Sequence, residues 1–148
     1  MGKFEKDTGA GRFFKDFKKY HGLPVQDAIF FNQSDLICDM AKHEDFIVMG
    51  RCADVVLTNH HIPHISIFIT ASSDQSVRRM MEINSLNYKQ AEHLLKKLDK
   101  RHERYYHAYT GKKWGDAVNY DLCIDSASYG IEESVELIER MINKYPNS

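Results

Sequence analysis

The sequence predicts an α/β protein with three layers, in which helices cover both faces of a parallel sheet. The first observation is three short apolar runs of strand length, at 45–50, 65–71 and 120–125. The second is that stretches with helical spacing of apolar residues separate these runs. Strands that alternate with helices pair in parallel and are covered by those helices. At 148 residues, the chain has the length of one domain with a substantial core.

The overall composition is that of an ordinary globular chain without a charge excess. Hydrophobic residues make up 43% and charged residues 28%, and the net charge is -1. Generic binding to nucleic acid or to a membrane surface depends on excess positive charge, so we expect neither partner. The first residues lack the apolar region of a signal peptide and no run is long enough to span a membrane, which predicts a cytoplasmic protein. The three cysteines show no Cys-x-x-Cys pairing, so no disulfide framework or metal site is predicted from them.

The first half of the chain begins with residues 1–24, which show no clear period. We predict an irregular segment or a short amphipathic helix there, and a folded domain from 25 to 148. Residues 25–42 have helical spacing of apolar side chains. The apolar run 45–50 ends on glycine, which predicts a buried strand that leads into the loop Gly50–Asp54.

The second half contains the other two strands and three helices. Ser72 follows the strand 65–71 and is a good N-cap for a helix. Asn87 is a second N-cap, with Gln90 in the capping-box position, and it begins a long helix. That helix is expected to end near Gly111, because glycine readily adopts the left-handed conformation that follows a helix. A last helix follows the third strand, and its predicted buried stripe is Ile131, Val135, Ile138, Met141 and Ile142.

The long helix carries a basic face. Lys97, Lys100, Arg101 and Arg104 recur at three- and four-residue intervals and so share one side of a helix. Such a face can present several cations to one polyanion, although a solvated surface is the more common outcome for a charged helix. Two arginines, and the Lys-Lys-Trp loop that follows at once, favour phosphate binding.

Polar residues follow each predicted strand at its carboxyl end, where parallel sheets bind ligands. They are Arg51 and Asp54 after the first strand, Ser72, Arg78 and Arg79 after the second, and Asp125 and Ser126 after the third. Together with Arg101 and Arg104 they are expected to converge on one edge of the sheet. Several arginines at such an edge suit phosphoryl transfer, which depends on positioning and on neutralising charge.

Five stretches of the sequence form a recognisable series. They are, in chain order, Val48-Met49-Gly50-Arg51-Cys52-Ala53-Asp54, Phe68-Ile69-Thr70-Ala71 with Arg78-Arg79, Asp99-Lys100-Arg101 through Tyr105-Tyr106, Tyr109-Thr110-Gly111-Lys112-Lys113-Trp114-Gly115-Asp116, and Asn119-Tyr120-Asp121-Leu122-Cys123-Ile124-Asp125. Together they resemble the cytidylate kinase-like family of P-loop nucleoside monophosphate kinases. The resemblance covers roughly Gln33 to the C-terminus.

The resemblance implies a protein that transfers the terminal phosphoryl group of ATP, with Mg²⁺, to CMP or a related nucleotide. Residues 25–148 would then be the acceptor and lid parts, where the lid is the segment that closes over the phosphates. By this resemblance, Arg51 would bind the phosphate of the acceptor nucleotide, together with Arg78 or Arg79, and Asp54 would contact its sugar or base. Arg101 and Arg104 would close over the transferring phosphoryl group. Ser126 would lie near the adenine of ATP. In cytidylate kinases proper the Asp directly follows Gly-Arg, whereas here Cys52 and Ala53 intervene.

The phosphate loop of the family is missing from the sequence. No Gly-x-x-x-x-Gly-Lys-Ser/Thr stretch occurs in the 148 residues, and neither does the family's first strand, which lies centrally in its sheet. The expectation is that the chain is part of a longer protein, or that residues 1–24 or a second, strand-swapped copy fill the gap. We expect no phosphoryl transfer by the 148 residues alone.

Two other functions stay open. The first is a catalytically inactive remnant that binds a nucleotide or a protein partner, or only forms oligomers. The second is a metal site at His60, His61 and His64, although a solvated turn is the more common outcome because no carboxylate or cysteine completes a ligand set nearby. Trp114, between two glycines, is expected to hold its loop in place.

Overall fold

The computed structural model describes Tyr20 and residues 22–145. These residues divide into two compact units, one up to Ile62 and one from Pro63 onward. The predicted irregular segment 1–24 falls almost entirely outside the described residues. No helix within the described ranges is long and apolar enough to cross a membrane.

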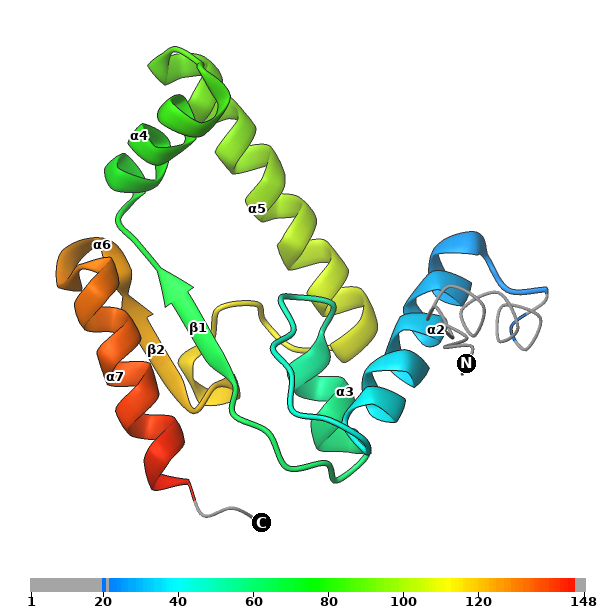
Figure 1. Cartoon of the computed structure of the whole chain (residues 1–148). Coiled ribbons are helices and arrows are strands. Elements are labelled where there is room, and N and C mark those ends of the chain that lie inside the picture. Colours follow the sequence, from blue (N-terminus) through cyan, green and yellow to red (C-terminus); the bar gives the residue numbers. More distant parts are fainter. Residues whose placement is uncertain (1–19, 21, 146–148) are drawn as a thin grey trace, which may run out of the picture. The chain divides into compact units, whose positions relative to one another are not determined.

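The described part of the first unit contains helices and an extended segment (Figure 1). Helix α2 spans Val25–Met40 and α3 spans Ala53–Asn59, and the two helices pack on each other. The predicted helix at 25–42 is therefore confirmed. The core of this unit is a cluster of Ile37, Ala53 and Leu57, with Ala41, Phe46, Val48 and Ile62 packed against it.

The predicted strand at 45–50 is wrong, because this segment is extended but belongs to no sheet among the described residues. Its side chains alternate as they would in a strand: Phe46 and Val48 pack on the cluster, while Ile47 and Met49 are 95% and 88% exposed. A strand requires a neighbour to satisfy its backbone N–H and C=O groups. No described segment pairs with 45–50, and only every second side chain is covered, so the segment is not the buried strand that was predicted.

The second unit contains a two-stranded parallel sheet, in which β1 (Ile67–Thr70) pairs with β2 (Leu122–Asp125). The register places Ile67 opposite Leu122 and Thr70 opposite Asp125. Two of the three predicted strands are thus confirmed, and the protein is α/β. The predicted three-layer sheet does not occur among the described residues, because they supply only these two strands.

Helices make up most of the second unit. They are α4 (Ser73–Asn84), α5 (Tyr88–Thr110), the short 3₁₀ helix η2 (Ala117–Asn119), α6 (Ser126–Tyr129) and α7 (Ile131–Lys144). Helices α4 and α5 form a hairpin, and α6 contacts both strands and α7 (Figure 1). The predicted buried stripe of α7 is partly wrong, because Ile131, Val135 and Ile142 are each about half-exposed. An apolar period predicts a face but not what covers it.

Candidate functional site

The α4–α5 hairpin holds four of the predicted site residues, and local sequence determines where its helices begin. The Ser72 side chain accepts a hydrogen bond from the backbone N–H of Gln75 at the start of α4. Asn87 and Gln90 form the predicted capping box at the start of α5, with hydrogen bonds of 3.0 and 3.1 Å. Val77 of α4 and Ala91 of α5 are the most completely buried residues of their helices. The hairpin therefore has fixed ends and a small core.

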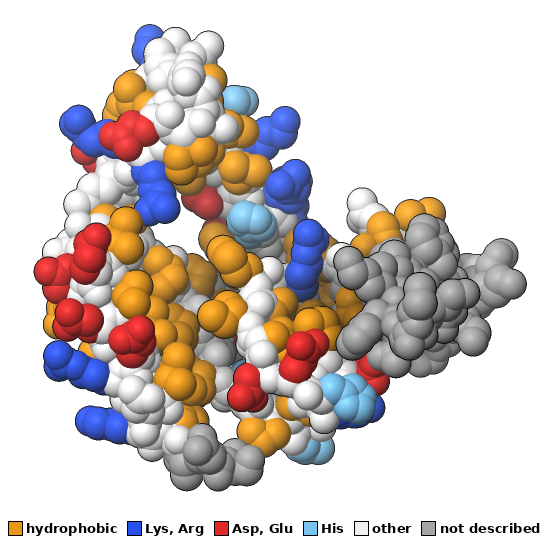
Figure 2. All heavy atoms as spheres, viewed as in Figure 1, with side chains coloured by type: hydrophobic (Ala, Val, Ile, Leu, Met, Phe, Trp, Pro, Cys, Tyr) orange, Lys and Arg blue, Asp and Glu red, His pale blue; other side chains and the backbone are white. Residues whose placement is uncertain are grey.

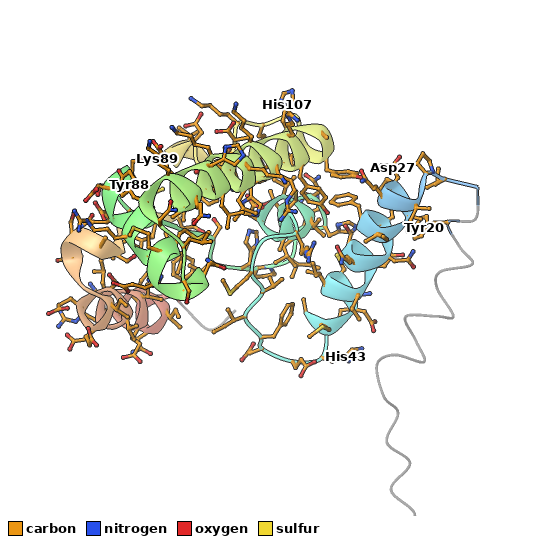
Figure 3. All side chains as sticks on the ribbon, turned by 90° about the horizontal axis from the view of Figure 1, so that it is seen from above. Tyr20, Asp27, His43, Tyr88, Lys89 and His107 are labelled. Atoms are coloured by element: carbon orange, nitrogen blue, oxygen red, sulfur yellow. The ribbon has the colours of Figure 1, made fainter. Side chains whose placement is uncertain are left out.

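The basic face of α5 is fully presented to solvent. Lys97, Lys100, Arg101 and Arg104 are all exposed, and none forms an ion pair with another described residue. Neighbouring Lys96, by contrast, is paired with Glu92 at 2.8 Å. Figure 2 shows Lys and Arg side chains spaced along α5, and Figure 3 shows the same helix extending from Tyr88 and Lys89 to His107. Within the described part of the chain, nothing neutralises the four cations of the basic face, so they are available to an anion.

The two arginines of α4 differ in their partners. The Nε of Arg78 donates to Asp74 Oδ2 at 2.8 Å, and this hydrogen bond raises the pKa of Arg78 above its usual value. Arg79 is exposed and forms no ion pair within the described part of the chain. Adjacent residues on a helix point about 100° apart, so the two side chains serve different directions. Arg79 is the one with its charge uncompensated.

Arg51 lies in an unusual backbone turn in the first unit. Gly50, Arg51 and Cys52 have consecutive φ angles of 70°, 60° and 53°, all in the left-handed region. Residues with a Cβ adopt this region at a cost, and such positions concentrate at functional sites. Cys52 is the N-cap of α3, and its carbonyl oxygen accepts from Val55 and Val56 at 3.1 and 2.9 Å. The turn is therefore fixed by the helix and presents Arg51 to solvent, with Asp54 in the first turn of α3.

Ser126 is the first residue of α6, directly after β2. Asp125 caps this helix: its Oδ1 accepts from the backbone N–H groups of Ala127 and Ser128 at 3.1 and 3.0 Å. The hydroxyl of Ser128 also donates to Asp125 Oδ2 at 2.8 Å. These hydrogen bonds, chiefly those from Ser128, lower the pKa of Asp125 below its usual value. Ser126 thus lies on a well-defined strand-to-helix turn.

Trp114 links α5 to β1, as expected of a residue that holds its loop in place. Its ring lies 5.4 Å from the ring of Phe68 on β1 and 5.4 Å from the imidazole of His102 on α5. The sequence did not identify Phe68 or His102 as its partners. Only the helical phase of His102, on the same side of α5 as Leu98 and Tyr105, pointed toward an inward contact.

The predicted site residues fall into two groups in the structure. Arg51 and Asp54 lie in the first unit, and Arg78, Arg79, Arg101, Arg104 and Ser126 lie in the second. Within the second unit, the four arginines are all carried by the α4–α5 hairpin, whereas Ser126 follows the sheet. The convergence of all these residues on one edge stays a prediction.

A metal site at His60, His61 and His64 is not supported. Across Tyr20 and residues 22–145, no group of three His, Cys, Asp or Glu side chains is arranged to hold a metal ion. The Nδ1 of His60 lies 2.8 Å from the carbonyl oxygen of Val56, which gives this ring a local structural partner.

Comparison with known proteins agrees with the resemblance. A family model described as the cytidylate kinase-like family matches residues 1–128, so the match begins before Gln33 and includes the N-terminal segment. A crystal structure of an uncharacterized protein from Eubacterium ventriosum ATCC 27560 is 30% identical, with a TM-score of 0.71. That similarity covers 93% of this chain and 76% of the other. No curated protein matches the chain. Because the family model covers most of the sequence, the chain belongs to the cytidylate kinase-like family.

Proposed function

We propose that the chain contributes the acceptor and lid parts of a nucleoside monophosphate kinase that transfers a phosphoryl group from ATP to CMP or a related nucleotide. Family membership supports a kinase-like relationship. The observation that carries the proposal further is the basic face of α5, where four exposed cations have no partner among the described residues. Phosphoryl transfer depends on such charges, because the protein stabilises the transferring group by position and electrostatics.

The roles proposed for the arginines are those that the family resemblance implies, and the surroundings of each residue are compatible with them. Arg101 and Arg104 would contact the transferring phosphoryl group, since both lie on the uncompensated face of α5. Arg51 would hold the acceptor's phosphate from its left-handed turn, with Asp54 toward the sugar or base. On α4, Arg79 is the better phosphate ligand, because Asp74 already neutralises Arg78. Ser126 would lie near the adenine of ATP.

The described residues fit ATP and Mg²⁺ only in part. They offer cations for phosphate oxygens, and Mg²⁺ bound through phosphates and water needs few protein ligands. However, the 148 residues contain no Gly-x-x-x-x-Gly-Lys-Ser/Thr stretch, whose backbone N–H groups cradle the ATP phosphates. The proposed transfer reaction therefore requires a phosphate loop that these 148 residues do not contain, and it holds if the full-length protein supplies one.

A kinase assay on the complete reading frame tests this proposal. The common nucleoside monophosphates are offered with ATP and Mg²⁺, and Arg101→Gln and Arg104→Gln are compared with Lys89→Gln. Lys89 is an exposed cation at the opposite end of α5 (Figure 3) and serves as the matched control. We expect turnover with CMP or a relative, a kcat reduced about 100-fold or more in the arginine variants, and no change in the control. Absence of turnover with every acceptor would refute the proposal.

The second candidate is an inactive member of the family that binds nucleotides or forms oligomers. The observation in its favour is the segment 45–50, which alternates like a strand but has no pairing partner among the described residues. A second, strand-swapped copy could supply that partner. Light scattering on the 148-residue chain measures its oligomeric state, and a titration with nucleotides measures binding. A concentration-dependent dimer that binds no nucleotide favours the oligomerisation module.

A further inference from the structure

The ring of Trp114 lies between two elements of the second unit. It contacts Phe68 of β1 edge-to-face, with an interplanar angle of 82°, and it contacts His102 of α5 at 48°. Edge-to-face pairs such as Trp114 and Phe68 attract each other beyond the area that they bury. Trp114 is also the only tryptophan of the protein. One side chain thus connects the helix that carries the basic face to the sheet.

The loop that carries Trp114 packs closely against β1. Gly111 ends α5 with a φ of 68°, and Gly115 has a φ of 74°. A Cβ on Gly115 would lie 3.1 Å from Phe68 Cζ, so the loop backbone closely approaches the Phe68 ring. That ring also lies 5.0 Å from the ring of Tyr120. Phe68 therefore packs against both the Trp114 loop and Tyr120, and His102 adds a contact from α5 to the Trp114 ring.

His102 lies between the two lid arginines in the sequence of α5. Each residue turns the helix by about 100° and advances it by about 1.5 Å. A contact that fixes the direction of His102 therefore also fixes the directions of Arg101 and Arg104. Loss of that contact would remove one of the packing contacts that hold the C-terminal half of α5, beside that of the buried Tyr106.

We infer that the His102–Trp114 contact positions the basic face of α5 relative to β1. His102 and Trp114 are positioning residues here, since neither is proposed to touch a nucleotide. This inference rests on the proposed function for its kinetic consequence, but the contact itself is a property of the second unit alone. His102 is exposed, so its replacement removes the contact without opening a cavity in the core.

The kinetic test uses the complete reading frame with His102→Ala, His102→Phe and His93→Ala. His93 is an exposed histidine on the same helix and provides the matched control. We expect His102→Ala to lower kcat about tenfold with the KM for the acceptor unchanged, because the positioned charge acts on the transferring group. His102→Phe keeps a ring against Trp114 and should restore most of the rate. Equal kcat in His102→Ala and wild type would overturn the inference while the proposed function stands.

Absence of phosphoryl transfer by the wild type would refute the proposed function but would leave the inference about His102 undecided. In that case, amide hydrogen exchange on the 148-residue chain tests the inference. We expect faster exchange across residues 98–110 in His102→Ala than in wild type or His93→Ala, with an accompanying change in Trp114 emission. Unchanged exchange in His102→Ala would overturn the inference.

Discussion

Asp121 Oδ2 accepts hydrogen bonds from both the backbone N–H and the hydroxyl of Ser66, at 2.8 and 3.0 Å, across 55 residues of sequence. In return, the backbone N–H of Asp121 donates to the carbonyl oxygen of Ser66 at 2.9 Å. The pair precedes β1 and β2 at the same end of the sheet and so sets the register of a short two-stranded ladder.

Asp121→Ala should destabilise the protein by about 1 kcal/mol, because the Ser66 N–H and hydroxyl both lose their acceptor at an exposed position. Ser66→Ala removes only the hydroxyl and should cost less than Asp121→Ala. Urea denaturation measures the free energy of unfolding of both variants, and an unchanged m-value shows that the comparison with wild type is valid. A larger loss for Ser66→Ala than for Asp121→Ala would show that the carboxylate does not act as described.

Arg51→Gly should separate stability from ligand binding. At a φ of 60°, glycine relieves about 1–2 kcal/mol of backbone strain, against about 0.4–1 kcal/mol of added entropy in the unfolded chain. The expected net gain is about 0.5 kcal/mol, with weaker binding of the acceptor's phosphate. Arg51→Ala keeps the strain and loses the charge, so it should weaken binding equally without the gain in stability. Thermal unfolding and calorimetric titration test the pair, and a less stable Arg51→Gly would contradict the strain argument.

The three cysteines should differ in reactivity. Burial raises the pKa of Cys52 to about 11, so very little thiolate is present at pH 8. Cys38 is also buried and its pKa is raised, chiefly by burial, whereas Cys123 is exposed. A disulfide-exchange reagent should therefore modify Cys123 rapidly in the native protein, and all three cysteines in denaturant. Mass spectrometry that located the fast modification at Cys52 would contradict the burial of that side chain.

The cap of α6 should be sensitive to acid. The pKa of Asp125 is lowered in the folded protein, so its contribution to stability is present above the unfolded pKa of about 3.9 and is lost as pH falls through the folded pKa. Ser128→Ala removes the hydroxyl donor but leaves the backbone donors of the cap. A carboxyl NMR titration should then show an Asp125 pKa closer to its usual value. An unchanged Asp125 pKa in Ser128→Ala would mean that the hydrogen bond from the Ser128 hydroxyl does not stabilise the ionised carboxylate.

Local chemistry in the sequence predicted most of the second unit correctly. The capping box at Asn87 and Gln90 and the glycine at 111 defined α5 because they are short-range features that need no tertiary partner. The runs at 65–71 and 120–125 became strands because each found the other as a parallel neighbour.

Short-range features did not reveal that residues 45–50 lack a pairing partner among the described residues. Nor do they test whether the predicted site residues converge on one edge of the sheet. Alternation at Phe46 and Val48 shows which side chains pack inward, but pairing depends on a second segment that the pattern does not identify. Likewise, the phosphate-binding roles of Arg51 and Arg101 were implied by the family resemblance and stay predictions. The partners that neutralise or position such residues, such as Asp74 for Arg78 and Trp114 beside His102, depend on side-chain direction in space.

Calorimetric titration of the 148-residue chain with CMP and with ATP–magnesium tests the central claim most directly. If the chain carries the acceptor and lid parts of a nucleoside monophosphate kinase without a phosphate loop, CMP or a related monophosphate should bind saturably. That binding should be weaker in Arg51→Ala, and ATP–magnesium should show no micromolar binding. Absence of binding by every common nucleoside monophosphate would contradict the acceptor role, and micromolar binding of ATP–magnesium would contradict the dependence on a phosphate loop.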